Sequence, residues 1–115
     1  MSVESLRERF SNFVDAELRS LEVLSPTEIT LTMALQDKAR DFDWITLQLH
    51  FSGVSDARLV NEKQLGFIDM SNGVTFLKEG TLFAFGIDEC CNIEDIKNQI
   101  LYIIAKTLKT TESTF

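Results

Sequence analysis

The clearest pattern in the chain is the alternation of apolar and polar residues between Trp44 and Phe51. The apolar positions are every second residue, namely Ile45, Leu47, Leu49 and Phe51. The positions between them form a more polar set, namely Trp44, Thr46, Gln48 and His50. A period of two is typical of a strand with one buried face, so this segment predicts a central strand with an apolar side and a polar side.

Further strands are predicted before and after this segment. Residues 28–36 alternate in the same way, and we expect residues 18–24 to pair with them across a turn at Pro26. Gly53 predicts a bend or bulge, followed by another extended piece at 54–60. The remaining predicted strands and turns are 65–70, Asn72–Gly73, 74–78, Glu79–Gly80 and 81–87.

Two helices are predicted as well. Residues 2–17 place apolar side chains at three- and four-residue spacing with charges between them, which indicates an amphipathic N-terminal helix. Its apolar positions are Val3, Leu6, Phe10, Phe13 and Val14. Later in the chain, Asn92 can cap a short helix over 92–98, with a strand at about 100–108 after it. One continuous helix through both segments is the alternative, because isoleucines also recur there at helical spacing.

Together these elements predict a single α+β domain over residues 1–115. We expect an antiparallel β-meander sheet of about six to eight strands, with the amphipathic helix at the N-terminus and the short helix near the C-terminus. A chain of this length buries roughly two-thirds of its unfolded surface, so folding requires no disulfide and no metal.

Charge narrows the classes of partner. Eighteen acidic residues against eleven basic ones give a net charge of −7. Negative charge repels phosphate backbones, which argues against nucleic-acid binding and favours a basic protein partner. No apolar run approaches the ~20 residues of a membrane helix, and the N-terminus has no apolar signal-peptide region, so no membrane partner is expected. The adjacent Cys90 and Cys91 indicate reduced thiols and a cytoplasmic location.

The sequence contains no recognisable catalytic arrangement. His50 is the only histidine, and neither cysteine lies near it in the chain. Adjacent cysteines also miss the spacing of structural zinc ligands and of redox pairs. Phosphate-binding and metalloprotease motifs are absent from the sequence. We therefore predict no enzyme activity, no metal and no cofactor.

The polar side of the central strand is the candidate binding surface. Trp44 is an aromatic anchor of the kind found at the centre of protein interfaces, and charged residues lie near it in the sequence. The candidate protein-binding residues are Trp44, His50, Asp41, Asp43, Asp56 and Arg58. The alternative is that the N-terminal helix covers this face, with Phe10 and Phe13 packing on Trp44. Exposure of the Trp44 side chain decides between the two.

The segments "DWITLQLHF", "SGVSDARLV" and "CNIEDIKNQILYIIAKTL" resemble a group of small bacterial proteins. These proteins are grouped with the immunity proteins of polymorphic or contact-dependent toxin systems, and the resemblance covers residues of about 44–108. It implies a protein that binds and neutralises a cognate toxin, with no catalytic residue. It also implies that Tyr102–Lys106 is a strand. Toxin nucleases are commonly basic, which agrees with the negative charge of this chain.

Two other functions fit the pattern. One is a small-molecule-binding domain or enzyme in which "LFAFGI" lines an apolar pocket on the inner surface of a curled sheet. The other is a structural homodimer joined through the last strand as an open edge, so the expected state is monomer or homodimer.

Overall fold

The computed structural model describes residues 8, 10, 13–37, 41, 43–88 and 92–114 of the chain. Six strands and two short helices follow one another in these residues. The elements are β1 (Glu17–Ser25), β2 (Glu28–Asp37), β3 (Asp43–Arg58), the 3-10 helix η3 (Glu62–Phe67), β4 (Val74–Glu79), β5 (Leu82–Ile87), α2 (Ile93–Lys97) and β6 (Tyr102–Thr114).

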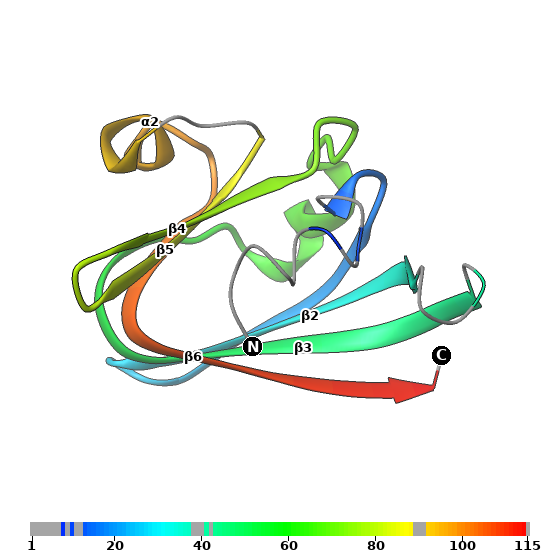
Figure 1. Ribbon diagram of the computed structural model, residues 1–115, viewed down its shortest axis with the longest axis horizontal. Coiled ribbons are helices and arrows are strands. Elements are labelled where there is room, and N and C mark those ends of the chain that lie inside the picture. The colour runs from blue at the N-terminus through cyan, green and yellow to red at the C-terminus, as the bar shows by residue number, and fades with distance from the viewer. Residues whose placement is uncertain are drawn as a thin grey trace.

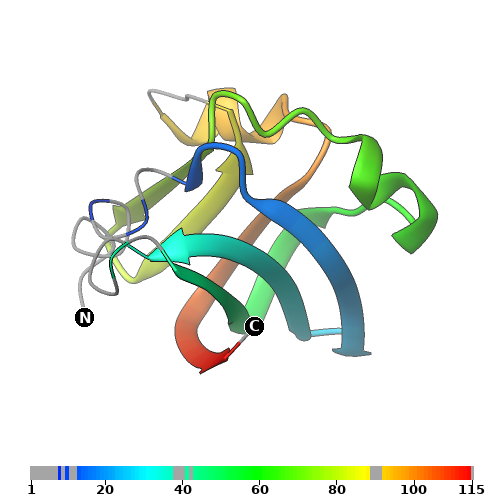
Figure 2. The ribbon, with the colours of Figure 1, turned by 90° about the vertical axis from the view of Figure 1, so that its right-hand side faces the viewer.

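All six strands form one antiparallel sheet in the order β1-β2-β3-β6-β5-β4. It consists of two three-stranded meanders, β1–β2–β3 and β4–β5–β6, joined where β6 pairs with β3. The sheet curls, so that β4 and β5 lie over β2 and β3 (Figures 1 and 2). A single meander was expected, and the placement of β6 beside β3 corrects that expectation.

Gly53 marks the point beyond which the long strand β3 pairs with β6 alone. β3 pairs with β2 as far as Ser52 and with β6 as far as Arg58. Gly53 has φ +65°, and a Cβ built on it would lie 3.0 Å from the Cβ of Lys106 on β6. The bend predicted at Gly53 is confirmed, and glycine is required there by both its backbone angle and the close approach of β6.

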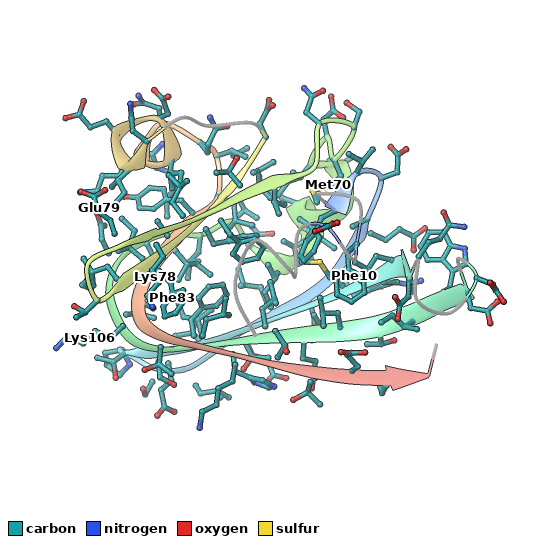
Figure 3. All side chains as sticks on the ribbon, in the orientation of Figure 1. Phe10, Met70, Lys78, Glu79, Phe83 and Lys106 are labelled. Atoms are coloured by element: carbon teal, nitrogen blue, oxygen red, sulfur yellow. The ribbon has the colours of Figure 1, made fainter. Side chains whose placement is uncertain are left out.

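The inner face of the curled sheet holds the main hydrophobic core. Aromatic rings from four parts of the chain meet there in a continuous series: the ring centres are 5.6 Å apart for Phe10–Phe13, 5.4 Å for Phe13–Phe76, 5.1 Å for Phe76–Phe85 and 5.7 Å for Phe51–Phe85. Figure 3 shows Phe10 between the two layers of the sheet. A smaller cluster lies outside β5 and β6, where α2 covers them; its buried members are Ala84, Ile96, Tyr102 and Ile104.

The predicted α+β class is wrong, because the chain is almost entirely β. Of the predicted helix over 2–17, residues 2–7, 9, 11 and 12 lie outside the described residues. In the described part, Phe13 and Asp15 have φ of 63° and 61°, and β1 begins at Glu17. The backbone N–H of Phe13 donates to Phe10 O and that of Ala16 to Phe13 O. These tight turns bury both phenylalanines at a spacing of three, which imitates one face of a helix.

Residues 65–70 were also predicted wrongly, as a strand. They begin inside η3, whose first turn is capped by Asn61 Oδ1 accepting from Lys63 N at 3.1 Å. The expected hairpin at Asn72–Gly73 therefore lacks its first strand, and Gly73 N closes a turn on Met70 O instead. The short helix and the last strand are confirmed as α2 and β6, which rules out the continuous helix.

Candidate protein-binding surface

Trp44 lies on the outer face of the sheet, opposite Gln36 of β2. Its side chain is 41% exposed, whereas that of the next residue, Ile45, is 2% exposed. Phe10 and Phe13, which were expected to cover Trp44 in the alternative arrangement, are instead buried in the core. These two phenylalanines therefore do not cover Trp44 on the outer face of β3.

Asp41 and Asp43 are exposed beside Trp44. Asp41 has φ 55° in the turn before β3, a conformation that Asp adopts more easily than most residues. We call Asp41, Asp43 and Trp44 the Trp44 surface. The strand register brings the start of β1 to the same end of the sheet, because Glu17 pairs with Ala34 and Ala34 with Thr46. The carboxylate-bearing Glu17 is therefore at the same end of the sheet as the Trp44 surface.

Two lysines lie at the opposite end of the molecule. Lys78 and Lys106 come together with Phe83 near the end of the β4–β5 hairpin (Figure 3). The Lys78 ammonium lies 5.4 Å from the centre of the Phe83 ring, within the range of a cation–π contact. The positive charge of this pair is therefore held away from the Trp44 surface.

His50 lies on the same outer face but holds strands together. Its Nδ1 is 3.1 Å from Thr30 Oγ1 on β2, and its Nε2 is 3.0 Å from Thr111 Oγ1 on β6. Both ring nitrogens are thus engaged with hydroxyls of neighbouring strands. His50 is six residues from Trp44 in the same strand, or about 20 Å at the rise of an extended chain. The structure does not bring it to the Trp44 surface.

Asp56 and Arg58 lie beyond the Gly53 bend, beside α2. Asp56 Oδ1 accepts from the Tyr102 hydroxyl at 3.1 Å, and its Oδ2 is 3.5 Å from Lys97 Nζ. Arg58 donates to Gln99 O at 3.1 Å, and its guanidinium lies 5.6 Å from the Tyr102 ring centre. Burial raises the pKa of Tyr102, and its hydrogen bond to Asp56 raises it further. These two candidates belong to a separate network that fastens α2 to the sheet.

A groove lies between the start of β1 and η3. It has a volume of about 490 Å³. Its lining combines residues 15–19 with Leu65, Gly66 and residues 68–71. The lining contains three carboxylates, those of Asp15, Glu17 and Asp69, and one cation, Arg19. Arg19 Nη2 is 2.8 Å from Glu17 Oε2. Sequence reasoning did not find this feature, because it depends on η3 where a strand was expected.

The described residues contain neither a metal-binding group nor a membrane-spanning helix. Within the described ranges, no three His, Cys, Asp or Glu side chains are grouped so as to hold a metal ion. In the same part of the chain, no helix has the length and apolar character needed to cross a membrane. Cys90 and Cys91 lie outside the described residues.

Comparison of the chain with protein-family models, with curated proteins and with solved structures gave no match in any of the three. The case for a function therefore rests on the geometry of the Trp44 surface and on the sequence resemblance described above.

Proposed function

We propose that this chain is a non-enzymatic protein-binding domain that acts in the cytoplasm as an immunity protein, binding and neutralising a basic toxin. The observation that carries the proposal is the exposed ring of Trp44 beside the exposed carboxylates of Asp41 and Asp43. Tryptophan is among the residues that contribute most to protein interfaces when a partner covers them. The flanking carboxylates suit a partner of positive charge.

The net charge of −7 supports the same assignment. A basic toxin and an acidic inhibitor attract each other before contact, which raises the association rate. The resemblance of residues 44–108 to immunity proteins gives the proposal its biological form, since such proteins act by occluding a toxin and need no catalytic group.

The inner surface of the sheet gives no support to a small-molecule site. Phe85, in the strand expected to line a pocket, is fully buried against Phe51 and Phe76. Their rings occupy the space that a ligand would need. A dimer through the last strand would have to use residues 106–114 of β6, because β5 pairs only with Tyr102–Ala105, and no observation favours a second copy there.

The proposal is tested with the product of the neighbouring reading frame, if that product is a basic toxin, by co-expression and by titration calorimetry. The wild-type chain should rescue growth, and Trp44→Ala should weaken binding about 30-fold, equivalent to about 2 kcal/mol at a hot spot. Ile100→Ala is the matched control, because Ile100 is also an exposed apolar side chain (57%) but lies between α2 and β6. Equal binding by wild type and Trp44→Ala would remove Trp44 from the interface.

A further inference from the structure

β1 is the more exposed of the two outermost strands of the sheet. It pairs with β2 on one side only, and five of its nine residues are exposed. The other edge strand, β4, begins with three buried residues, Val74–Phe76. In the described part of the chain, the backbone bond from Asp15 N to Met70 O (2.9 Å) lies just before β1, and β1 has no strand partner beyond it. An edge of this kind presents unpaired N–H and C=O groups to an added strand.

The two faces of β1 differ in chemistry along its regular part. Register shifts interrupt the β1–β2 pairing on either side of Ser20–Val23. Within this run, Leu21 and Val23 pair with the inward-facing Leu31 and Ile29, whereas Glu22 pairs with the outward-facing Thr30. Val23 is 58% exposed. A strand added here would place one set of side chains beside Leu21 and Val23, and the alternate set beside Glu22.

The groove described above continues this edge towards the Trp44 surface. Asp15, Glu17 and Asp69 lie in its lining, and Arg19 is already paired with Glu17. Asp69 Oδ1 accepts from Ser71 N at 2.9 Å, and this bond lowers the pKa of Asp69, which keeps it ionised. The path along the edge is therefore negative from Glu22 to Asp15.

We infer that β1 accepts an extended segment of the basic partner as a seventh strand, and that this segment alternates basic with apolar residues. The inference rests on the proposed function for the identity of the partner. Main-chain hydrogen bonds to Ser20–Val23 supply affinity, the apolar side chains cover Leu21 and Val23, and the basic ones face Glu22. A second copy of this chain is a poor occupant, because this edge is negative and two copies of it would repel each other.

The experiment uses a defined probe, an acetylated and amidated octapeptide that alternates lysine with valine. Backbone hydrogen exchange is followed by NMR at increasing peptide concentration. Amides of Ser20–Val23 should exchange at least about fivefold more slowly when the peptide is bound. Amides of the other edge strand, Val74–Glu79, should keep their rates.

The control peptide has the same four lysines but prolines in place of two valines, so it keeps the charge and cannot form a strand. Protection of β1 by both peptides would show that charge attraction alone causes the protection, and it would overturn the inference. Absence of protection at saturating concentration, or equal protection of β4, would overturn it as well.

A pair of variants tests the electrostatic part. Glu22→Lys should raise the Kd of the lysine–valine peptide roughly fivefold or more, because it places a cation beside the incoming lysines. Glu79→Lys makes the same change at an exposed position on the β4 edge and should leave the Kd unaltered. Equal effects of the two variants would show that only net charge matters and would contradict the inference.

The outcomes separate this inference from the proposed function. The peptide test needs no toxin and does not involve Trp44. Toxin binding that depends on Trp44, without protection of β1 by the peptide, leaves the immunity function standing and removes the seventh strand. Protection of β1 by the peptide, in a chain that binds no basic toxin, leaves the seventh strand standing and removes the immunity function.

Discussion

The hydroxyl of Tyr102 on β6 donates a hydrogen bond to Asp56 on β3, across 3.1 Å. The same carboxylate lies 3.5 Å from Lys97 of α2, so one aspartate connects two strands and a helix. Tyr102 is 7% exposed, and its ring packs under α2 with Ile96. The network lies beyond Gly53, where β3 no longer pairs with β2. It therefore stabilises the part of β3 that only β6 supports.

Tyr102→Phe should lower the free energy of unfolding by about 1 kcal/mol, because it removes one hydrogen bond and keeps the ring. Urea denaturation followed by Trp44 fluorescence measures the change. Asp56→Asn retains an acceptor for the hydroxyl and should cost less than Tyr102→Phe. A larger loss for Asp56→Asn would show that the Lys97 ion pair, and not the hydroxyl, holds this corner.

Tyr102 should also titrate above the ordinary range of tyrosine. Its pKa is raised above 10.0 by burial and by its bond to Asp56. Since the folded pKa exceeds the unfolded one, this contribution to stability is complete below pH 10 and is lost as the pH rises through the folded pKa. Tyr102 is the only tyrosine, so ultraviolet absorbance reports it directly. A midpoint at or below the ordinary value in the folded protein would contradict the burial of its hydroxyl.

Gly53→Ala should destabilise the fold by about 1–2 kcal/mol, since alanine is strained at positive φ. The new Cβ would also lie 3.0 Å from the Cβ of Lys106. Gly66→Ala is the matched control, because its Cβ would meet nothing within 4 Å. We expect the free energy of unfolding of the control to lie within about 0.5 kcal/mol of the wild-type value. Chemical denaturation of both variants makes the comparison, and equal stabilities would refute the strain at Gly53.

Trp44→Ala should leave the chain folded. It should lower the free energy of unfolding by clearly less than about 4 kcal/mol, the typical cost of removing a core tryptophan. The reason is its exposure of 41%. The chain has one tryptophan, so quenching of its fluorescence by acrylamide tests the same property. Quenching should be strong in the native protein, and a stability loss of core size would place the ring inside the fold.

Asp41→Asn and Asp43→Asn together should slow association with a basic toxin and weaken its dependence on salt, because both carboxylates are exposed beside Trp44. Stopped-flow mixing at two salt concentrations measures the association rate. Asp56→Asn removes one such charge beyond the Gly53 bend and is the control for each of the two substitutions made singly. An equal effect of Asp56→Asn would mean that the partner responds to net charge alone.

Local alternation was sufficient to predict most of the sheet. β2 and β5 were predicted to within about two residues, the usual precision of such boundaries, and the turn at Pro26 and the bend at Gly53 have the residues that those conformations require. The signals that predict these features, alternation and turn residues, lie within a few residues of one another in the sequence. For this reason a single sequence reveals them.

The errors arose where tertiary contacts decide the structure. Phe10 and Phe13 are three residues apart because both reach the core from consecutive tight turns, and the same spacing also describes a helix. Residues 65–70 contain apolar side chains in a strand-like order, but Asn61 caps η3 just before them. A periodic pattern records which residues are buried, and it does not record which backbone buries them.

The candidate site divided for a related reason. Trp44, His50, Asp56 and Arg58 belong to one strand, and sequence proximity grouped them. In a strand of 16 residues, the ends lie far apart, and the bend at Gly53 turns the second half towards α2. The register of β3 with β2 and β6 then decides the neighbours of each side chain, and register is a property of partner strands.

The central position of β6 has a consequence for biosynthesis. β1, β2 and β3 can pair with one another as soon as they leave the ribosome. The other neighbour of β3 is β6, which is synthesised much later: β3 ends at Arg58, and β6 begins at Tyr102, more than 40 residues downstream. Until Tyr102–Thr114 has emerged, the nascent chain exposes a hydrophobic β3 edge, and Phe85 has no β6 to pack beside it. A pairing so distant in sequence folds slowly. The nascent chain should therefore remain incompletely folded until the last strand enters the sheet.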